Sequence, residues 1–267
     1  MMKAKQSIGR FFRYVRRHPM MYLMLIPGLF FLFIYKFAPL YGILIAFKDY
    51  NIFAGSNPID AIAKSPWVGF ANFERLFKRS EFIKVLVNTL IINGMKILFL
   101  FPIPIICAIL LNEIRNKAFR KLSQTAIYVP YFFSWVVVFG IFYSLFGSYG
   151  VVNNVIAALG HARIKFFTDT GIFRWLLVFT EGWKEIGYNT VIYLAAITGI
   201  DIALYEAASV DGANKWKQIW HVTMPGLLPT IVLMFILKVG YILDTGFEQV
   251  LVFYNPAVYD VADIIQT

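Results

Sequence analysis

Long apolar runs, separated by short polar segments, dominate the pattern of residues along this chain. Five runs are long enough to cross about 30 Å of hydrocarbon, which takes about 20 helical residues at 1.5 Å each. Backbone polar groups in lipid must be hydrogen-bonded within their own segment, so such runs form helices. The pattern therefore predicts an all-α, polytopic transmembrane helix bundle. The predicted spans are residues 20–47, 85–111, 126–145, 172–200 and 226–243.

The first and fourth runs are longer than a span requires, so they must tilt, kink or leave the membrane. Pro39 and the pair Pro102 and Pro104 are candidate kinks. Between the first two spans, residues 48–84 carry a set of apolar side chains at helical spacing. This set predicts a short helix, which could lie at the membrane surface or pack as a lid on the bundle. Its members are Phe70, Phe73, Leu76 and Phe77.

Composition and charge support a membrane protein. Of 267 residues, 59% are hydrophobic and 15% are charged, whereas a soluble domain carries about 25% charged residues. The net charge of +10 could suggest nucleic acid, but Lys and Arg accumulate in the cytoplasmic loops of polytopic proteins. With the N-terminus inside, the inner segments carry a net +8 and the outer segments −1. We therefore expect a multi-pass protein with a basic cytoplasmic N-terminus, residues 1–19, and no nucleic-acid partner.

The residues that enzyme chemistry needs are not arranged for it. The chain contains no Gly-Lys dipeptide and hence no Walker A loop. Its three histidines are scattered, so they predict no metal shell, and Cys107 lies in an apolar run as a small hydrophobe. The first apolar run is too long for a signal peptide, so we expect a retained span. The sequence predicts no catalytic residue, bound cofactor or metal.

The polar segment 200–225, between the fourth and fifth predicted spans, has a distinctive pattern. It predicts two helical stretches broken at Gly212, because glycine permits the left-handed conformation at a helix end. Pro225 is expected at the start of the next helix. Ala207 and Ala208 provide a small face that another protein can approach closely. We expect a partner to cover the apolar stripe on the second stretch, formed by Trp216, Ile219 and Trp220.

The spacing within this segment resembles the EAA loop of bacterial ATP-binding-cassette (ABC) importer permeases. That loop reads Glu-Ala-Ala, three residues, Gly, nine residues, then Ile or Val, any residue, Leu or Met, and Pro. The matching positions are Glu206, Ala207, Ala208, Gly212, Val222, Met224 and Pro225. Other motifs along nearly the whole chain are similar to LplB-type sugar permeases of the maltose-permease superfamily. They include Phe47–Tyr50, Trp67–Phe70, Leu111–Glu113, Trp183–Thr190, Phe247–Gln249 and Tyr254–Pro256.

This resemblance implies a permease subunit that imports carbohydrates, oligosaccharides in particular, and is not itself an enzyme. ATP would be bound and hydrolysed by a cytoplasmic ABC ATPase dimer. The other implied partners are a second homologous permease subunit, an extracellular solute-binding protein and the lipid of a bacterial cell membrane. Such permeases have six spans and five are found here, so we expect the transmembrane permease domain, residues 20–267, to be truncated before the sixth.

By the same resemblance, residues 206–212 would form the coupling helix that docks on the ATPase. Glu206 would be its polar anchor, Ala207 and Ala208 its close-contact face and Gly212 its bend. The neighbouring residues Tyr205, Asp211 and Pro225 complete the set of candidate coupling residues, without an assigned role.

The fourth predicted span provides candidates for the substrate pathway, because it carries ionisable groups near its middle. Each costs at least ~2.5–3.5 kcal/mol at that depth, so each should face water or the protein interior. Glu181, Glu185, Tyr188 and Asn189 share a helical face, and Lys184 lies three residues from Glu181. The alternative is a structural ion pair between this span and a neighbour. The candidate pathway residues are Glu181, Trp183, Lys184, Glu185, Tyr188 and Asn189, in which Trp183 and Tyr188 offer aromatic faces to a sugar.

A different class of function, an ion-coupled secondary transporter, stays open as an alternative. In that case Glu181, Glu185 and Asp244 would relay protons or cations. A secondary transporter has no reason to keep an apolar helix–glycine–helix segment on its cytoplasmic side, which favours the importer. Weaker pathway candidates are Asn93, Lys96, Lys238, Tyr241 and Asp244, and the long side chain of Lys238 could instead reach the membrane surface.

Overall fold

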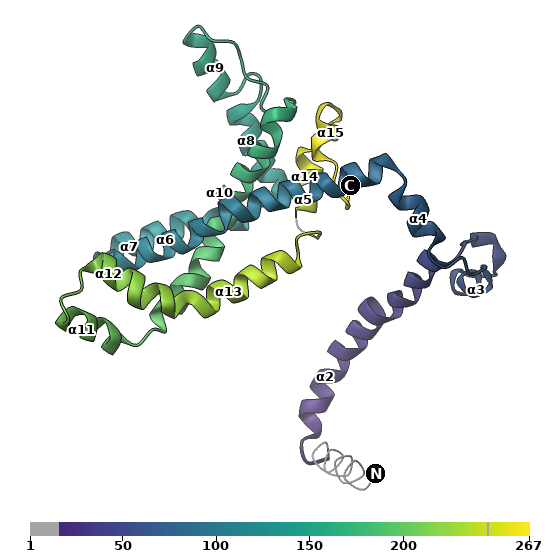
Figure 1. Ribbon diagram of the computed structural model, residues 1–267, viewed down its shortest axis with the longest axis horizontal. Coiled ribbons are helices and arrows are strands. Elements are labelled where there is room, and N and C mark those ends of the chain that lie inside the picture. Colours follow the sequence, from purple (N-terminus) through teal and green to yellow (C-terminus); the bar gives the residue numbers. More distant parts are fainter. Residues whose placement is uncertain (1–15, 245) are drawn as a thin grey trace. The chain divides into compact units, whose positions relative to one another are not determined.

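The computed structural model describes residues 16–244 and 246–267. Most of the predicted basic N-terminal segment, including Lys3 and Arg10, therefore lies outside the described residues. Within them every regular element is helical, apart from one isolated bridge between Lys48 and Trp67 (Figure 1). The all-α prediction is confirmed. The chain forms two compact units, Met1–Ser80 and Glu81–Thr267.

The first unit contains one long helical run followed by a loop with three short helices. Its run changes helix type before Pro39: the Ala38 N–H bonds the Phe33 carbonyl, five residues back. Because proline lacks an N–H and its ring crowds the carbonyl four residues back, this π-type turn lets the run continue through the predicted kink. The elements are α2 (Pro19–Leu32), η1 (Phe33–Phe37), η2 (Ala38–Phe47), η3 (Ile52–Ala54), α3 (Pro58–Lys64) and α4 (Ala71–Phe77).

The helix predicted in residues 48–84 is α4. Phe70 and Phe73 pack on Phe47, at the end of the first run, with ring centroids 5.5 and 5.4 Å apart. Trp67 stacks on the same ring at 5.6 Å. Of the four predicted apolar positions, Phe70 and Phe73 therefore join an aromatic cluster inside the first unit, and Leu76 and Phe77 are exposed.

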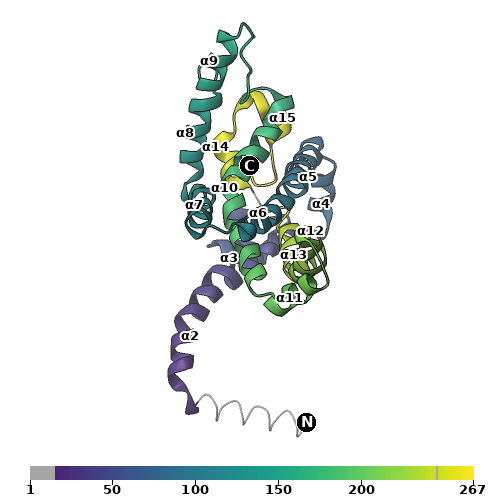
Figure 2. The same ribbon diagram turned by 90° about the vertical axis from the view of Figure 1, so that its left-hand side faces the viewer.

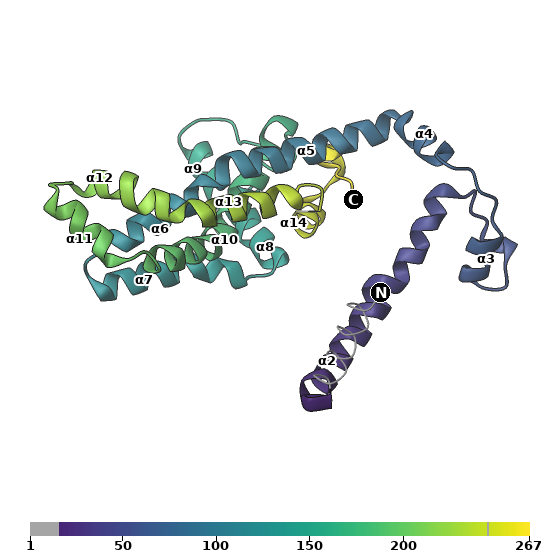
Figure 3. The same ribbon diagram turned by 60° about the horizontal axis from the view of Figure 1, so that its bottom comes forward.

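In the second unit, the long helix α10 (Thr170–Thr198) is central, and most other helices pack against it (Figure 2). α11 and α12 lie near one end of α10, and α14 and α15 lie near the other (Figure 3). The remaining elements are α5 (Ser80–Leu100), α6 (Pro102–Glu113), α7 (Lys117–Tyr128), η4 (Val129–Phe132), α8 (Trp135–Phe146), α9 (Val151–Ala158), α11 (Ile202–Val210), α12 (Lys215–Gln218), η5 (Ile219–Thr223), α13 (Met224–Gly240), α14 (Phe247–Phe253), η6 (Pro256–Val258) and α15 (Tyr259–Ala262).

Two hydrophobic clusters occupy the two halves of α10. One joins α8, the first half of α10 and the C-terminal segment through side chains such as Phe142, Phe173 and Phe253. The other joins α6, the second half of α10 and α13 through side chains such as Tyr193 and Leu227. The stretch of α10 between the clusters contains the buried polar residues Thr180, Glu181 and Lys184.

Four helical runs are long and apolar enough to cross a membrane, and a fifth is the bent pair α10 and α11. The four are Pro19–Phe47, Ser80–Glu113, Trp135–Ala158 and Lys215–Gly240. The predicted bounds of the third span, 126–145, are wrong. Phe133 is extended, and the Ser134 hydroxyl accepts the Val137 N–H at 3.4 Å, so a new helix begins at residue 135. The cap outweighs the apolar character on which the prediction rested.

The fifth span begins eleven residues before its predicted start at 226, because the helix runs on from Lys215 to Gly240. Pro225 lies in the first turn of α13, as expected, but the helical run does not begin there. A π-type turn over Ile219–Thr223 precedes it, and the Met224 N–H bonds the Ile219 carbonyl. This turn accommodates the proline as the turn before Pro39 does. The second half of the EAA segment is therefore continuous with a membrane span.

The C-terminal segment, residues 247–267, folds back onto α5, α8 and α10. Arg174 of α10 donates to the Val261 carbonyl at 3.1 Å and to Asn88 Oδ1 of α5 at 2.7 Å. The Tyr254 hydroxyl donates to Asp263 at 2.5 Å. Burial, together with that carboxylate, raises the pKa of Tyr254 to about 12, so the hydroxyl keeps its proton at any ordinary pH.

Candidate functional site

A charged centre lies between the two hydrophobic clusters, where four helices each contribute one side chain: Lys96 of α5, Glu181 of α10, Lys238 of α13 and Gln249 of α14. Lys96 Nζ lies 2.6 Å from Glu181 Oε2 and donates to Gln249 Oε1, also at 2.6 Å. Lys238 Nζ lies 3.7 Å from the other oxygen of Glu181. The side chains of Lys96 and Glu181 are only 2% and 7% exposed, so this ion pair is buried.

Further hydrogen bonds and a close backbone approach hold the charged centre in place. The Gln249 amide donates to the Leu177 carbonyl at 2.7 Å and to Thr180 Oγ1 at 2.8 Å. Gly246 has φ +92°, and a Cβ there would lie 2.8 Å from Lys96 Nζ. A buried charge is tolerated only when it is paired and its other polar atoms are hydrogen-bonded. The centre meets this condition with residues that are 153 positions apart in sequence, Lys96 and Gln249.

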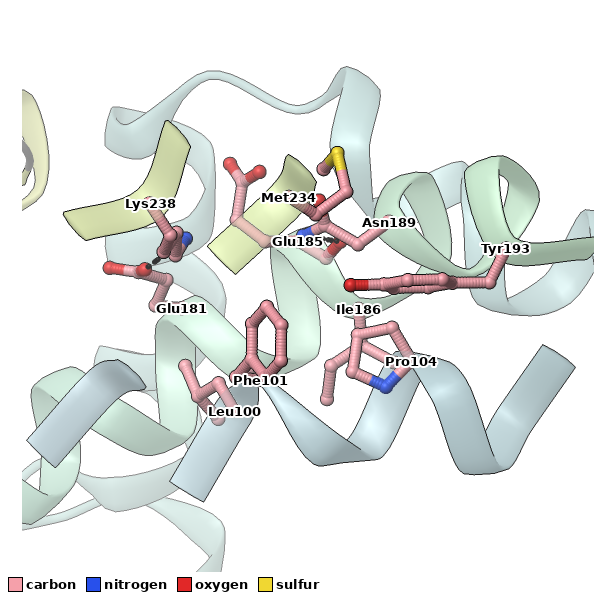
Figure 4. A pocket seen from close by; sticks show the side chains of 11 residues that line it. Leu100, Phe101, Pro104, Glu181, Glu185, Ile186, Asn189, Tyr193, Met234 and Lys238 are labelled. Atoms are coloured by element: carbon pink, nitrogen blue, oxygen red, sulfur yellow. Dashed lines mark hydrogen bonds and ion pairs between the residues drawn. The ribbon is translucent and has the colours of Figure 1, made fainter. Parts of the chain in front are cut away.

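A small cavity of about 30 Å³ borders the charged centre (Figure 4). Glu185 and Asn189 line it along α10, and the Asn189 amide donates to the Glu185 carbonyl at 3.1 Å. This volume holds about two water molecules, so a sugar ring fits only if the helices around it move apart. The other lining residues are Leu100, Phe101, Pro104, Glu181, Gly182, Ile186, Tyr193, Met234 and Lys238.

Lys184 does not pair with Glu181, although the two lie three residues apart on α10. Its ammonium group donates to the Tyr131 carbonyl at 2.6 Å and lies over the rings of Tyr131 and Trp135, at 5.0 and 5.5 Å. Glu181 is instead occupied by Lys96 from another helix. The structural alternative, an ion pair between this span and a neighbour, is therefore present, but with a partner other than Lys184.

The two aromatic pathway candidates lie away from the cavity. Trp183 packs against Phe142 with ring centroids 5.5 Å apart. Tyr188 stacks on Tyr131 at 4.4 Å, with the two rings inclined by 10°. Gly187 lets α10 approach this region, because a Cβ there would lie 1.8 Å from the Ile127 carbonyl oxygen. The structure thus divides the predicted pathway set: Glu181, Glu185 and Asn189 line the cavity, and Trp183, Lys184 and Tyr188 do not.

The residues that complete the charged centre were not among the main candidates predicted from the sequence. Lys96 and Lys238 were weak candidates, and Lys238 turns toward Glu181 rather than toward the membrane surface. Gln249 was not a candidate, although an isolated amide in the apolar run of α14 is a usable signal. Asn93 donates to the Ile242 carbonyl at 2.6 Å, and Asp244 accepts from Gln266. Among the described residues, no three His, Cys, Asp or Glu side chains could hold a metal ion.

Residues 200–225, which contain the predicted coupling helix and are called the coupling segment below, form a second candidate site near the other end of α10. α11 is bent by 69° from α10, and its first turn is capped by Asp201, which accepts the Ala203 N–H at 2.9 Å. The helix ends where the Ala213 N–H bonds the Ala208 carbonyl and Gly212 adopts φ +73°. This left-handed residue turns the chain into α12, so the helix–glycine–helix pattern is present.

No residue of α11 is buried, although much of the helix is apolar. Val210 is 88% exposed, and Trp216 on the following helix is 70% exposed. Glu206 and Ala207 are also exposed, whereas Tyr205 and Ala208 are half-buried. An exposed apolar surface of this kind marks an interaction site. Asp211, Gly212 and Pro225, the remaining predicted coupling residues, are exposed as well.

Comparison with known proteins identifies the family. Residues 101–266 match the model of the binding-protein-dependent transport system inner membrane component. The chain therefore belongs to this family of inner-membrane permeases. The matched part of this permease contains α6 to α15, and with them the cavity and the coupling segment.

Relatives of this permease match nearly its full length. It is 41% identical to protein LplB of Bacillus subtilis over 95% of this chain and 78% of that protein. It is 42% identical to the polygalacturonan/rhamnogalacturonan transport system permease YteP of the same organism, over 92% of this chain and 75% of that protein. A bacterial ABC transporter involved in importing the acidic polysaccharide alginate has a chain that superposes with a TM-score of 0.85, at 37% identity, covering 97% of this chain and 85% of its own.

These similarities decide between the two classes of transporter. The permease is a multi-pass membrane protein and a subunit of an ABC importer rather than an ion-coupled secondary transporter. Glu181, which is buried, and Glu185, which is half-buried, are therefore not needed as a proton or cation relay. Their place beside the cavity needs another explanation.

Proposed function

We propose that this permease imports oligosaccharides, with acidic ones the first class to test. The observation that carries the proposal is identity of about 40% with sugar-importer permeases over more than nine-tenths of the chain. One of those relatives is named for polygalacturonan and rhamnogalacturonan, and the structural neighbour is an alginate importer. The net charge of +10 adds no support for an acidic substrate, since most of the excess lies in the segments expected inside.

The proposed assembly has a cytoplasmic ABC ATPase dimer, a second homologous permease and an extracellular solute-binding protein, in a bacterial cell membrane. A related alginate transporter has been solved with a periplasmic protein bound to an alginate pentasaccharide. In our proposal the N-terminus and α11 are cytoplasmic, which agrees with the excess of basic residues in the segments on that side. ATP is hydrolysed by the partner and not by this chain.

In this assembly α11 is the coupling helix. Glu206 anchors it to the ATPase, and the small side chains of Ala207 and Ala208 allow close contact, while Gly212 sets the bend that presents the helix. Tyr205 and Asp211 flank this surface, and Pro225 lies beyond it on the span that follows. The support is geometric, because the helix is fully capped yet exposes its apolar side chains to a partner.

The substrate pathway is proposed to follow the face of α10 that carries Glu181, Glu185 and Asn189. Carboxylate and amide groups hydrogen-bond sugar hydroxyls, and the cavity beside them borders the charged centre. The aromatic side chains Trp183 and Tyr188, with Lys184, lie on other flanks of the same helix. They would contact substrate only in a conformation in which the neighbouring helices have moved.

The charge reversal Glu206→Lys tests the coupling role. We expect the variant to insert in the membrane normally, to lose the ATPase subunit on purification and to lose oligosaccharide uptake by at least about tenfold. The matched control is Glu248→Lys, the same change at an exposed position of α14, near the other end of α10. Normal uptake by Glu206→Lys, or equal losses in both variants, would contradict the assignment.

The substrate class is tested with the importer co-purified from its genomic neighbours. ATPase activity is measured in proteoliposomes with the loaded binding protein and a panel of trigalacturonate, alginate pentasaccharide and arabinotriose. Stimulation by the two acidic sugars supports the proposal. Stimulation by arabinotriose alone would keep the importer and reject the acidic substrate.

A further inference from the structure

Polar contacts join α11 to the helical run that follows it. The Tyr205 hydroxyl lies 2.9 Å from Thr223 Oγ1, and Gln218 Nε2 donates to Ser209 Oγ at 2.8 Å. Ser209 in turn donates to the Tyr205 carbonyl at 2.8 Å. Two side-chain hydrogen bonds therefore join α11 to the following run, Gln218 to Ser209 and Tyr205 to Thr223, and we call these four residues the α11 latch.

Two of the four latch residues are shielded from solvent, whereas Ser209 is exposed and Tyr205 is half-buried. Gln218 is 8% exposed and Thr223 is 4% exposed, although the helix above them has no buried residue. Because α11 contributes no buried apolar side chain, hydrophobic packing does little to hold it in place. Hydrogen bonds with one buried partner are directional, and a buried partner left unsatisfied costs free energy, so the latch fixes the position of the helix.

An open groove of about 1,090 Å³ lies between α11 and the ends of α6 and α10. Glu113 and Arg115 line it on the α6 side, and the latch residues Tyr205, Ser209 and Gln218 also border it. One ion pair crosses this region, Lys215 Nζ to Glu113 Oε2 at 3.2 Å, and both side chains are well exposed. Exposed pairs of this kind contribute little. A displacement of α11 is therefore resisted by the latch much more than by α6.

The latch connects α11 to a span that reaches the charged centre. Gln218 and Thr223 belong to the continuous helical run Lys215–Gly240. Near the far end of that run, Lys238 lines the cavity and lies 3.7 Å from Glu181. A movement of α11 that is transmitted through the latch would therefore shift a wall of the cavity.

We propose that Gln218 and Thr223 are positioning residues that make α11 and the run Lys215–Gly240 move as one body, so that displacement of the coupling helix opens the cavity. This rests on the proposed coupling role of α11. Neither residue needs to touch the ATPase or the substrate. If the run Lys215–Gly240 transmits the movement as a rigid element, it must be firmly connected to α11 at the end where the movement begins.

The functional test measures ATP hydrolysed per oligosaccharide imported, with the co-purified importer in proteoliposomes and the most stimulating sugar of the panel above. Gln218→Leu and Thr223→Val remove the hydrogen bonds at similar volume. We expect the ATPase subunit to stay bound, while the ratio rises by at least about fivefold. Ser209→Ala should raise it too, and Ser209→Thr, which keeps the hydroxyl, should restore it. Lys215→Met, which breaks the exposed ion pair on the same helix, should leave it unchanged.

An unchanged ratio in Gln218→Leu and Thr223→Val would overturn the proposal. So would a parallel loss of both activities together with the ATPase subunit, because a residue that only stabilises the fold would give that result. If Glu206→Lys proves harmless instead, the coupling role itself fails, and the two failures are thereby distinguished.

A second measurement does not depend on the partners. Spin labels at Val210→Cys and Leu233→Cys, both exposed positions, report the distance between α11 and the middle of α13, with Cys107 replaced by alanine. We expect one narrow distance distribution in the otherwise unmodified chain and a broad one in Gln218→Leu. A narrow distribution in both would overturn the proposal, whatever the ATPase assay shows.

Discussion

The charged centre and the coupling segment are built in opposite ways. At the centre, side chains from four helices, three of them buried, interact over large sequence separations. In the coupling segment, the caps and turns are local: Asp201 caps α11, and Gly212 ends it within the same stretch of chain. The latch is the exception, because it spans 18 residues between Tyr205 and Thr223.

This difference determines what each region tolerates. Removing one partner from the buried centre leaves a buried charge uncompensated, so the stability of the whole fold should fall. Removing one local contact from an exposed helix frays that helix and leaves the spans intact.

The largest effect should follow from Lys96→Met. The substitution leaves Glu181 with only Lys238 at 3.7 Å and leaves the Gln249 carbonyl oxygen without its donor. We expect a loss of about 3–5 kcal/mol in unfolding free energy, measured by chemical denaturation in detergent.

Lys84→Met is the control, since Lys84 forms an exposed ion pair with Asp260 and should cost at most about 1 kcal/mol. Replacing both buried partners, with Lys96→Met and Glu181→Gln together, should recover part of the loss. Equal losses of unfolding free energy in Lys96→Met and Lys84→Met would show that the buried centre is no more important for stability than a surface ion pair.

An intermediate effect is expected from Gly187→Ala, in the span but away from the charges. The added Cβ would lie 1.8 Å from the Ile127 carbonyl oxygen, a backbone atom that cannot rotate away. Overpacking of this kind costs about 1–3 kcal/mol, visible as a lower Tm in detergent.

Gly94→Ala is the matched control, because no atom lies within 4 Å of a Cβ at that position of α5. It should be neutral or slightly stabilising, since alanine is the better helix former. If both variants melt alike, α10 and the end of α7 are not in close contact.

The smallest effect should come from Asp201→Ala in the coupling segment. Loss of the cap to Ala203 costs about 1 kcal/mol, confined to α11. Hydrogen exchange should accelerate in the first turn of α11, while the Tm stays unchanged. Asp201→Asn keeps an oxygen acceptor and should preserve slow exchange. A global loss of stability in Asp201→Ala would mean that the exposed helix supports the spans after all.

Much of the fold could be predicted from sequence where a signal is local. The apolar runs, the break near Pro102 and the helix–glycine–helix pattern each depend on neighbouring residues. The errors arose where one local feature outweighed another. The Ser134 cap starts the third span later than its apolar run begins, and a π-type turn carries the fifth span through Pro225. For the site, Glu181, Glu185 and Asn189 share the cavity. Tyr188, predicted on the same face, stacks on Tyr131 instead, and the partner of Glu181 was missed.

The sequence by itself determined that this chain spans a membrane, which family it resembles and where its helix–glycine–helix segment lies. These properties follow from hydropathy, charge asymmetry and the spacing of a short motif. The tertiary structure alone decided that Lys96 rather than Lys184 neutralises Glu181, that Gln249 completes the charged centre and that Gln218 and Thr223 hold α11. The physical reason is that a buried charge is satisfied by whichever donor packing brings within about 3 Å, and helix packing is not encoded in the spacing of residues along one helix.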